Sequence, residues 1–390
     1  MWEDVEELLP VDGLSGIFVG RIWSPEGEGG PLPVRVRDDG VYDLSHLAPT
    51  LAEILNLPDA ASIIRASDGR RVGETQSALA NSAYDRRNPE LPYYLAPSDL
   101  QATKAAGVTF VKSMLERVIE EQARGDLKLA EEIRLNIADQ IGGSLRDIDP
   151  GSEAAERVKM VLLEKGLWSQ YLEVGIGPDA EIFTKCQPLA SVGIGAQIGI
   201  HPKSIWNNPE PEAVLSINSR GQIIGATLGN DVNLRDFEGR SALLLGKAKD
   251  NRASSALGPF IRLFDDSFDL DDVRQMQIVL RVAGEDGFVM EGSSSLSEIS
   301  RDLQALAEAT VNESNQFPDG VMLYTGTMFA PTEDRDAAGQ GFTHHVGDVV
   351  SISNNKLGKL VNRVEHCDQI APWSFGISHL MQNLAKRGML

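Results

Sequence analysis

Short apolar runs, divided by proline, glycine and aspartate, fill residues 1 to about 95. The run from Gly16 to Trp23 has the length and composition of a strand between turn signals. Apolar spacing from Leu47 to Leu57 predicts one helix among these strands. We therefore predict a small α+β domain over residues 1–95, with the Pro-containing segment Arg86 to Tyr94 as its linker.

The next part of the chain, residues 96–168, is helical in character. Apolar residues recur every three to four positions among many charges, which is the pattern of amphipathic helices. The pattern ends at Gly142–Gly143, and Ser152 is placed to cap a second helix that runs to Lys165. The positions that define the first helix are Leu115, Val118, Ile119, Ala123, Leu127, Ala130, Ile133 and Ile137.

From residue 169 to 390, short β-type runs alternate with Gly, Asn and Asp turns, and helix is expected only near 297–309 and at the C-terminal end. Strands do not alternate regularly with helices, so a larger, mostly antiparallel β domain is favoured over a doubly wound sheet. The fold class is therefore α+β. The clearest predicted strands are Ala213–Ile217, Gln277–Val282, Gly320–Tyr324 and Asp348–Ser353.

The amino-acid composition limits the kinds of molecule that the protein is expected to bind. The 390 residues carry 57 acidic and 36 basic side chains, a formal net charge of −21. Such a surface repels nucleic acids and anionic membranes but attracts metal cations. Cys186 and Cys367 lack metal-site spacing and are interpreted as reduced thiols. The N-terminus has no signal-peptide pattern, and no apolar run approaches the roughly 20 residues of a membrane span. We expect a cytoplasmic protein without a nucleic-acid or membrane partner.

The strongest chemical signal is a predicted hairpin that carries three carboxylates. Glu210 and Glu212 alternate with other residues and so share one face of the first strand. If Arg220 and Gly221 form a two-residue turn, paired positions sum to 441 and Glu210 lies opposite Asp231. Directly opposed side chains have Cβ atoms roughly 4.5–5.5 Å apart. Three converging carboxylates need a cation, and oxygen-only ligation suits Mg²⁺, Mn²⁺ or Ca²⁺. The alternative is a solvated acidic hairpin.

Residues 170–375 resemble the fumarylacetoacetate hydrolase superfamily in the order of their motifs. The resemblance implies a catalytic domain with a mixed β-roll over 169–390, a small N-terminal α+β domain and a helical insertion over 96–168 that contributes to a lid. It also implies Mg²⁺, with Mn²⁺ possible, held by Glu210, Glu212 and Asp231. The matching motifs are Glu210-Pro-Glu212, Asn230-Asp231 to Arg235-Asp236, Lys249 ahead of Gly258-Pro259, Thr325-Gly326-Thr327 and Gly347-Asp348-Val349.

Departures from the family pattern indicate which of its reactions to expect. Where the hydrolases carry a His-Glu pair that activates water, this chain has Ser113 and Glu116, and serine cannot act as a base near neutral pH as histidine can. Glu238 stands where a glutamine is common. The sequence is more similar to the family's sugar-acid dehydratases, in runs that include residues 229–251 and 339–344. The resemblance therefore implies removal of water from a 2-keto-3-deoxypentonate, such as the xylonate or arabinonate, to give 2-oxoglutarate semialdehyde.

In that mechanism a metal chelates the substrate's carboxylate and 2-keto oxygen and acidifies the protons on carbon 3. Lys249 is the candidate base, because a lysine beside a cation and away from water can lose its proton near neutral pH. Glu116 is the candidate acid for the leaving hydroxyl, and the two roles can be exchanged.

Other residues are candidates for binding the substrate. Thr325, Gly326 and Thr327 offer hydroxyl and backbone donors to the substrate carboxylate, and Ser113 is a candidate partner for a hydroxyl. Arg235 either neutralises substrate charge or braces the metal carboxylates, unless it forms a salt bridge with Asp236.

Two other readings of the same site stay open. One is an acylpyruvate hydrolase or a 2-oxo acid decarboxylase, and the other is a binding protein without catalysis. The glycine-rich run Gly193 to Gly199 lacks the spacing of a dinucleotide loop. Adjacent His344 and His345 point to opposite faces of a strand and cannot chelate one metal together. Family resemblance implies a homodimer or homotetramer.

Overall fold

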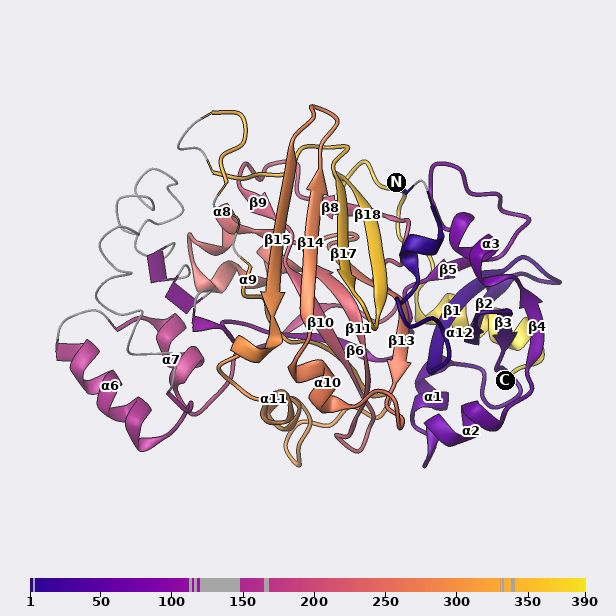
Figure 1. Cartoon of the computed structure of the whole chain (residues 1–390), viewed down its shortest axis with the longest axis horizontal. Coiled ribbons are helices and arrows are strands. Elements are labelled where there is room, and N and C mark those ends of the chain that lie inside the picture. Colours follow the sequence, from indigo (N-terminus) through magenta and orange to yellow (C-terminus); the bar gives the residue numbers. More distant parts are fainter. Residues whose placement is uncertain are drawn as a thin grey trace.

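The computed structural model describes residues 1–2, 4–111, 114–115, 118–119, 148–164, 168–329, 331, 333–337 and 341–390. Two large sheets dominate this part of the chain (Figure 1). The strands are β1 (Ile17–Ser24), β2 (Gly30–Arg37), β3 (Gly40–Asp43), β4 (Arg70–Gly73), β5 (Tyr93–Leu95), β6 (Ala102–Ala106), β7 (Ile182–Cys186), β8 (Gln197–Ile200), β9 (Asn207–Asn208), β10 (Pro211–Ile217), β11 (Ile223–Asp231), β12 (Asn233–Leu234), β13 (Ser255–Leu263), β14 (Gln277–Ala283), β15 (Val289–Ser295), β16 (Val321–Tyr324), β17 (Val349–Asn354) and β18 (Gly358–His366).

Helices pack against these sheets, and Ile54 and Ile64 share a hydrophobic core with Ile261 of the larger sheet. Ser152 caps the first turn of α6 by accepting a hydrogen bond from Ala155 N (3.2 Å), as the sequence predicts. The α-helices are α1 (Leu51–Leu55), α2 (Ala60–Ala66), α3 (Thr75–Ala80), α6 (Glu153–Glu164), α7 (Gln170–Ile176), α8 (Arg235–Glu238), α9 (Leu245–Lys249), α10 (Leu270–Arg274), α11 (Leu303–Thr310) and α12 (Ile377–Lys386). Short 3₁₀ turns are η1 (Glu6–Leu8), η2 (Ala242–Leu244) and η3 (Leu296–Glu298).

The larger sheet runs in the order β4-β3-β2-β1-β13-β11-β10-β16-β6-β7, with β5 paired to β1. Its strands come from both ends of the chain, because β1 pairs with β13 through Ile17 and Leu263. The predicted N-terminal region thus shares a sheet with the later strands, and it contains three helices where the sequence predicted one from Leu47 to Leu57. The domain boundaries at 95 and 168 stay a prediction.

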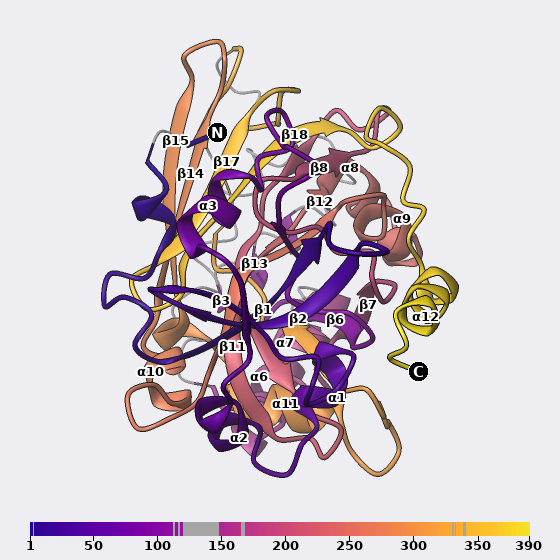
Figure 2. The same ribbon diagram turned by 90° about the vertical axis from the view of Figure 1, so that its right-hand side faces the viewer.

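The second sheet, in the order β15-β14-β17-β18-β8, packs on the first, as the side view in Figure 2 shows. In β14 exposed and buried positions alternate, so only one face is covered, whereas every residue of β10 and β13 is buried. This difference is expected when one sheet is solvated on its outer face and the other is covered on both. Phe260 of the first sheet and Leu280 and Ile352 of the second share one hydrophobic core.

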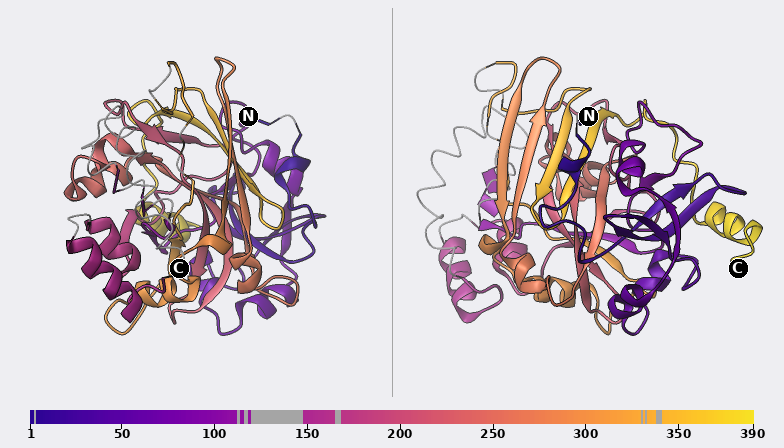
Figure 3. Two further views of the ribbon diagram at one scale, coloured as in Figure 1. Left: turned by 60° about the vertical axis from the view of Figure 1, so that its left-hand side comes forward. Right: turned by 45° about the vertical axis from the view of Figure 1, so that its right-hand side comes forward.

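The four strands predicted most clearly from sequence are present as β10, β14, β16 and β17. The expected mixed, antiparallel-rich fold is therefore confirmed: two of the pairings, β16 with β6 and β18 with β8, are parallel. In Figure 3, α6 and α7 lie at one end of the molecule and β1 to β4 at the other. No helix among the described residues is long and apolar enough to cross a bilayer.

Candidate metal centre

The predicted hairpin forms from β10 and β11, and its register matches the expectation. The paired positions Glu212–Gly229 and Pro211–Asn230 both sum to 441, and Asp231 N donates to Glu210 O (3.0 Å). The two-residue turn was wrong, however. Asn218 N donates to Gln222 O across a three-residue loop, and a bulge between Ser216 and Ile217 restores the register.

Because of this register, the three predicted carboxylates meet on one face. One oxygen from each of Glu210, Glu212 and Asp231 lies within 4.8 Å of the other two. All three side chains are buried, at 5%, 2% and 2% relative exposure. A solvated acidic hairpin is therefore excluded by the burial. Three buried carboxylate oxygens at this spacing fit a hard divalent cation, whose preferred ligands are oxygens.

Two lysines enter the same cluster from different elements. Lys249, the last residue of α9, donates from Nζ to Glu210 Oε2 and to Asp231 Oδ2 (3.0 Å). Lys185 of β7 is fully buried and contacts Asp231 Oδ1 at 2.8 Å, and it also donates to Val232 O at 3.1 Å. Asp231 is thus held between two cations. Lys185 was not predicted from sequence.

The lysines distribute the negative charge unevenly. Burial raises the pKa of Glu212 well above its ordinary value, and the neighbouring charges of Asp231 and Glu210 add to the rise. Burial also acts to raise the pKa of Asp231, but Lys185 and Lys249 outweigh it and hold this pKa below its ordinary value. Among the described residues no lysine or arginine nitrogen lies within 4.0 Å of the Glu212 carboxylate. The two lysines balance two of the three negative charges, and Glu212 is the carboxylate without a directly neighbouring cation among the described residues.

The loop after β16 closes one side of the cluster. Gly326 N donates to Glu212 Oε2 (2.7 Å), and Gly326 adopts a φ of +88° that favours glycine. The Thr325 hydroxyl donates to Ala213 O (3.0 Å), so it fastens the loop to β10. Thr327 lines the recess beside the carboxylates. Of the three predicted carboxylate-binding residues, the structure therefore brings Gly326 and Thr327 to the recess wall.

We call this space the carboxylate recess. Tyr171, Glu181 and Phe183 also line it and were missed by sequence reasoning, because they lie on α7 and around β7, far from the hairpin in the chain. Its lining residues are Ala106, Gly107, Val108, Tyr171, Glu181, Phe183, Glu210, Glu212, Asp231, Glu238, Lys249, Gly326 and Thr327.

Arg235 lies outside this lining. Its guanidinium stacks over the Trp206 ring at 4.3 Å and donates to Pro331 O (3.4 Å). Asp236, considered as its salt-bridge partner, instead accepts hydrogen bonds from Ser204 Oγ (2.7 Å) and Ile205 N (3.1 Å). Arg235 therefore braces the segment that precedes Glu210. The predicted acid Glu116 and the predicted hydroxyl ligand Ser113 lie outside the described residues, as does most of the helical stretch over 110–140.

The adjacent histidines lie in the loop before β17, not on a strand as predicted, and their side chains have different partners. His344 is buried, and its Nδ1 lies 3.3 Å from Asp348 Oδ2. Arg335 donates to both oxygens of Asp348. His345 instead contacts Asp286 and Asp336 near the surface. These ion pairs tie the loop before β17 to the end of the hairpin β14–β15.

The part of the chain that carries the carboxylate trio is similar to known proteins. Residues 195–365 match the profile of the family described as Fumarylacetoacetate (FAA) hydrolase C-terminal. A 2-dehydro-3-deoxy-D-arabinonate dehydratase from Saccharolobus solfataricus is 30% identical over 47% of this chain and 58% of its own length. A probable 2-keto-3-deoxyxylonate dehydratase from Haloferax volcanii is 26% identical over 84% of this chain and 93% of its own length.

Solved structures share the fold over most of the chain. The apo form of a 2-keto-3-deoxy-D-arabinonate dehydratase aligns with a TM-score of 0.63 at 21% identity, covering 90% of this chain and 99% of that one. A 2-keto-3-deoxy-D-arabinonate dehydratase complexed with magnesium and 2,5-dioxopentanoate aligns with a TM-score of 0.62 at 22% identity and the same coverage.

Proposed function

Since residues 195–365 carry a domain of the fumarylacetoacetate hydrolase C-terminal family, we propose that this chain is a Mg²⁺-dependent dehydratase of 2-keto-3-deoxypentonates. The substrate is 2-keto-3-deoxy-D-xylonate or the corresponding arabinonate, and the product is 2,5-dioxopentanoate. The observation that carries the proposal is the buried trio Glu210, Glu212 and Asp231 with Lys249 beside it. The two dehydratase relatives give the reaction class.

The metal, when bound by the three carboxylates, supplies a Lewis acid that polarises the 2-keto group of the substrate. The residues of the chain supply the rest. Gly326 N fixes the orientation of Glu212, and Lys185 fixes that of Asp231, so both carboxylates are held before substrate arrives. Manganese can replace magnesium at an oxygen-only site of this kind.

Lys249 is the proposed base. Lys249 is 3% exposed, and its ammonium lies 5.8 Å from the ring centre of Phe183, so the side chain is shielded from water. Once it is neutral, it takes a proton from carbon 3 of the substrate while the hydroxyl on carbon 4 leaves. Glu116 is the proposed donor of the proton that turns this hydroxyl into water. One water is lost and a double bond forms between carbons 3 and 4. A proton then moves from carbon 5 to carbon 3, and the resulting enol at carbon 5 tautomerises to the aldehyde.

The deciding experiment incubates the purified protein and Mg²⁺ with 2-keto-3-deoxy-D-xylonate or the arabinonate and identifies the products. We expect the aldehyde 2,5-dioxopentanoate, no loss of carbon, and no turnover after chelation with EDTA. Release of CO₂ or cleavage of a C–C bond would instead support the decarboxylase or acylpyruvate hydrolase reading. No turnover of either sugar acid would contradict the proposal.

A matched pair of lysines tests the base. Lys247 and Lys249 lie on the same short helix, but Lys247 is exposed and Lys249 is buried. We expect Lys249→Met to lower kcat roughly 100- to 10,000-fold, the range for loss of a general base. Lys247→Met should keep wild-type kcat. Equal rates in the two variants would remove Lys249 from the mechanism.

A further inference from the structure

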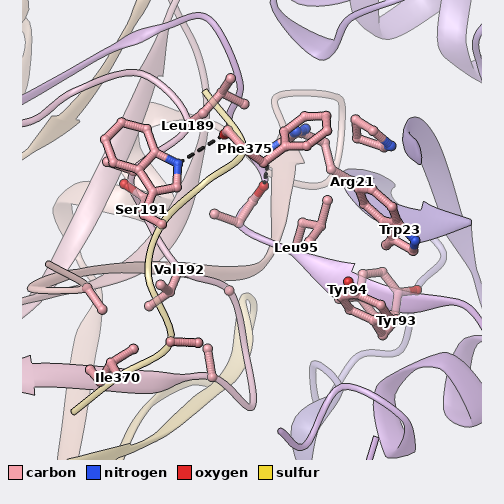
Figure 4. Close-up of a pocket in the computed structure, with 18 of the residues that line it drawn as sticks. Arg21, Trp23, Tyr93, Tyr94, Leu95, Leu189, Ser191, Val192, Ile370 and Phe375 are labelled. Atoms are coloured by element: carbon pink, nitrogen blue, oxygen red, sulfur yellow. Dashed lines mark hydrogen bonds between the residues drawn. The ribbon is translucent and has the colours of Figure 1, made fainter. Parts of the chain in front are cut away.

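A second cavity, of about 300 Å³, lies away from the metal centre and shares no lining residue with it. Strands β1 and β5 form one side, and the loop before β8 and the segment between β18 and α12 form the other. Figure 4 shows Trp23, Tyr93 and Tyr94 across the space from Val192 and Ile370. Its volume lies at the lower end of the roughly 300–1,000 Å³ typical of small-molecule sites.

Aromatic rings make up much of the wall. They are Trp23, Tyr93, Tyr94, Trp373 and Phe375. Trp23 and Phe375 meet edge to face with centroids 5.6 Å apart, which joins β1 to the C-terminal segment. Trp373 is half exposed, and its Nε1 donates to Phe375 O (3.0 Å). Such walls favour flat ligands, because rings stack on one another in offset or edge-to-face contacts.

The charged groups of the cavity are all positive. Arg21, Arg87 and Arg252 line it, and no aspartate or glutamate is among its described lining residues. Arg21 has a counter-charge in Asp99 (3.5 Å). In the described part of the chain no carboxylate lies within 4.0 Å of the Arg87 or Arg252 guanidinium. The cavity therefore holds two arginines without a local counter-ion, in a chain of net charge −21.

Backbone contacts account for part of this charge but not for all of it. Arg21 donates to Ala96 O (3.2 Å), and Arg252 donates to Ile370 O (2.8 Å), so both fasten neighbouring segments. Arg87 stacks over the Tyr93 ring at 4.0 Å and donates to Ser82 O (2.6 Å). Its Nε is buried without an acceptor among the described residues. A half-buried guanidinium on a tyrosine ring is an arrangement that binds the anionic end of a planar molecule.

We propose that this space, which we call the arginine cavity, binds a small organic anion with a flat aromatic ring. The ring lies among Trp23, Tyr93 and Phe375, and the anionic group pairs with Arg87 and Arg252. An aromatic carboxylate and a nucleoside monophosphate share this chemistry. The experiment below distinguishes these two sources.

Isothermal titration calorimetry of the full chain with Mg²⁺ tests the proposal with two anions and their neutral counterparts. The pairs are 2-naphthoate with 2-naphthamide, and AMP with adenosine. We expect one anion of the two to bind one site per chain, at least roughly tenfold more tightly than its neutral counterpart. The anion that binds identifies the source. Saturable binding of neither anion below about 10 mM, or equal binding of anion and neutral counterpart, would overturn the proposal.

Variants place the binding in the cavity. Arg87→Gln should weaken the anion roughly tenfold, whereas Arg157→Gln makes the same charge change on the exposed surface of α6 and should leave affinity unchanged. Equal weakening by both variants would show a general charge effect and reject the site. Loss of binding in Glu212→Gln but not in Arg87→Gln would assign the anion to the carboxylate recess and also reject it. If Arg87→Gln does not fold, Trp373→Ala on the half-exposed rim should weaken binding several-fold, because it removes part of the aromatic wall and the hydrogen bond that holds Phe375 in place.

Discussion

The carboxylate recess and the arginine cavity are opposites in charge, and they differ in how that charge is compensated. At the recess, the trio Glu210, Glu212 and Asp231 is buried, and Lys185 and Lys249 form ion pairs with Asp231 and Glu210. The arginine cavity gathers three guanidiniums, of which Arg21 alone has an acidic partner within 4.0 Å among the described residues. The trio and its two lysines thus form an ion-pair network short of one positive charge, and the cavity is an open cluster of cations.

The two spaces also differ in how the fold supports them. The recess is built on a hydrogen-bonded hairpin and has an open volume of about 30 Å³, whereas the cavity of about 300 Å³ is formed where several distant chain segments meet. Removal of a charge that takes part in an ion pair should therefore cost much more in the recess. Breaking a buried ion pair costs about 3–5 kcal/mol, whereas losing one ordinary hydrogen bond costs about 1 kcal/mol.

The largest effect is expected for Lys185→Met. This change leaves Asp231 with one lysine in place of two, inside a fully buried network. We expect the metal-free protein to lose about 3–5 kcal/mol of unfolding free energy, measured by urea denaturation. Lys104→Met is the control, because Lys104 lies on the neighbouring strand β6 and contacts only Thr184 Oγ1 through its Nζ among the hydrogen bonds of the described residues. A loss below about 1 kcal/mol for Lys185→Met would contradict the network.

Within the recess, substitutions at two of the proposed metal ligands should change the unfolding free energy in opposite directions. Asp231→Asn removes the counter-charge of two buried lysines and should lower the unfolding free energy of the metal-free protein by about 3 kcal/mol. Glu212→Gln relieves the crowding of three carboxylates and should raise it by about 1 kcal/mol. Added Mg²⁺ should raise the melting temperature of the wild type but of neither variant. A variant that Mg²⁺ still stabilises as it does the wild type would exclude that residue as a ligand.

A smaller effect is expected in the pH dependence of the metal-free protein. The pKa of Glu212 is raised in the folded state, so the folded protein binds this proton more tightly than the unfolded chain does. Stability from this group is therefore greatest below pH 4.5 and falls as pH rises toward the folded pKa. Asp231 acts in the opposite direction and stabilises the fold above pH 3.8, because its folded pKa is lowered. Glu212→Gln should remove the loss of stability between pH 4.5 and neutrality in urea denaturation series, and an unchanged slope would contradict this assignment.

The recess was more predictable from sequence than the cavity, for a physical reason. Strand alternation placed Glu210 and Glu212 on one face, and a register summing to 441 placed Asp231 opposite. The predicted register was correct although the predicted turn was wrong, because the bulge after Ser216 offsets the extra residue of the loop. Pairing within a hairpin is local, so one assumption about the turn was enough to bring the acids together.

For residues that meet only through distant strand pairings, the sequence pattern gives no such indication. Lys185 stands in an apolar strand, Ile182–Cys186, and nothing in that pattern says that β7 lies near Asp231. The cavity joins residues near positions 21, 87, 252 and 373, and its shape depends on β1 pairing with β13. Pairings between strands so far apart in the chain depend on the whole topology, so periodicity and spacing do not reveal them.

The smallest effect, and the sharpest test of the contrast, is expected for the stability of Arg87→Gln. The guanidinium gives one hydrogen bond to Ser82 O and one stacking contact to Tyr93, each worth about 1 kcal/mol or less. Burial lowers the pKa of Arg87, and Tyr93 offsets this only in part, with no carboxylate contributing. Removal of the desolvated charge therefore recovers some of the free energy that its burial costs. We expect a net change within about 1 kcal/mol in urea denaturation, against about 3–5 kcal/mol for Lys185→Met. A loss as large as that of Lys185→Met would mean that Arg87 holds the fold together as the recess lysines do, because a cation needed for stability cannot be counted as free for a ligand.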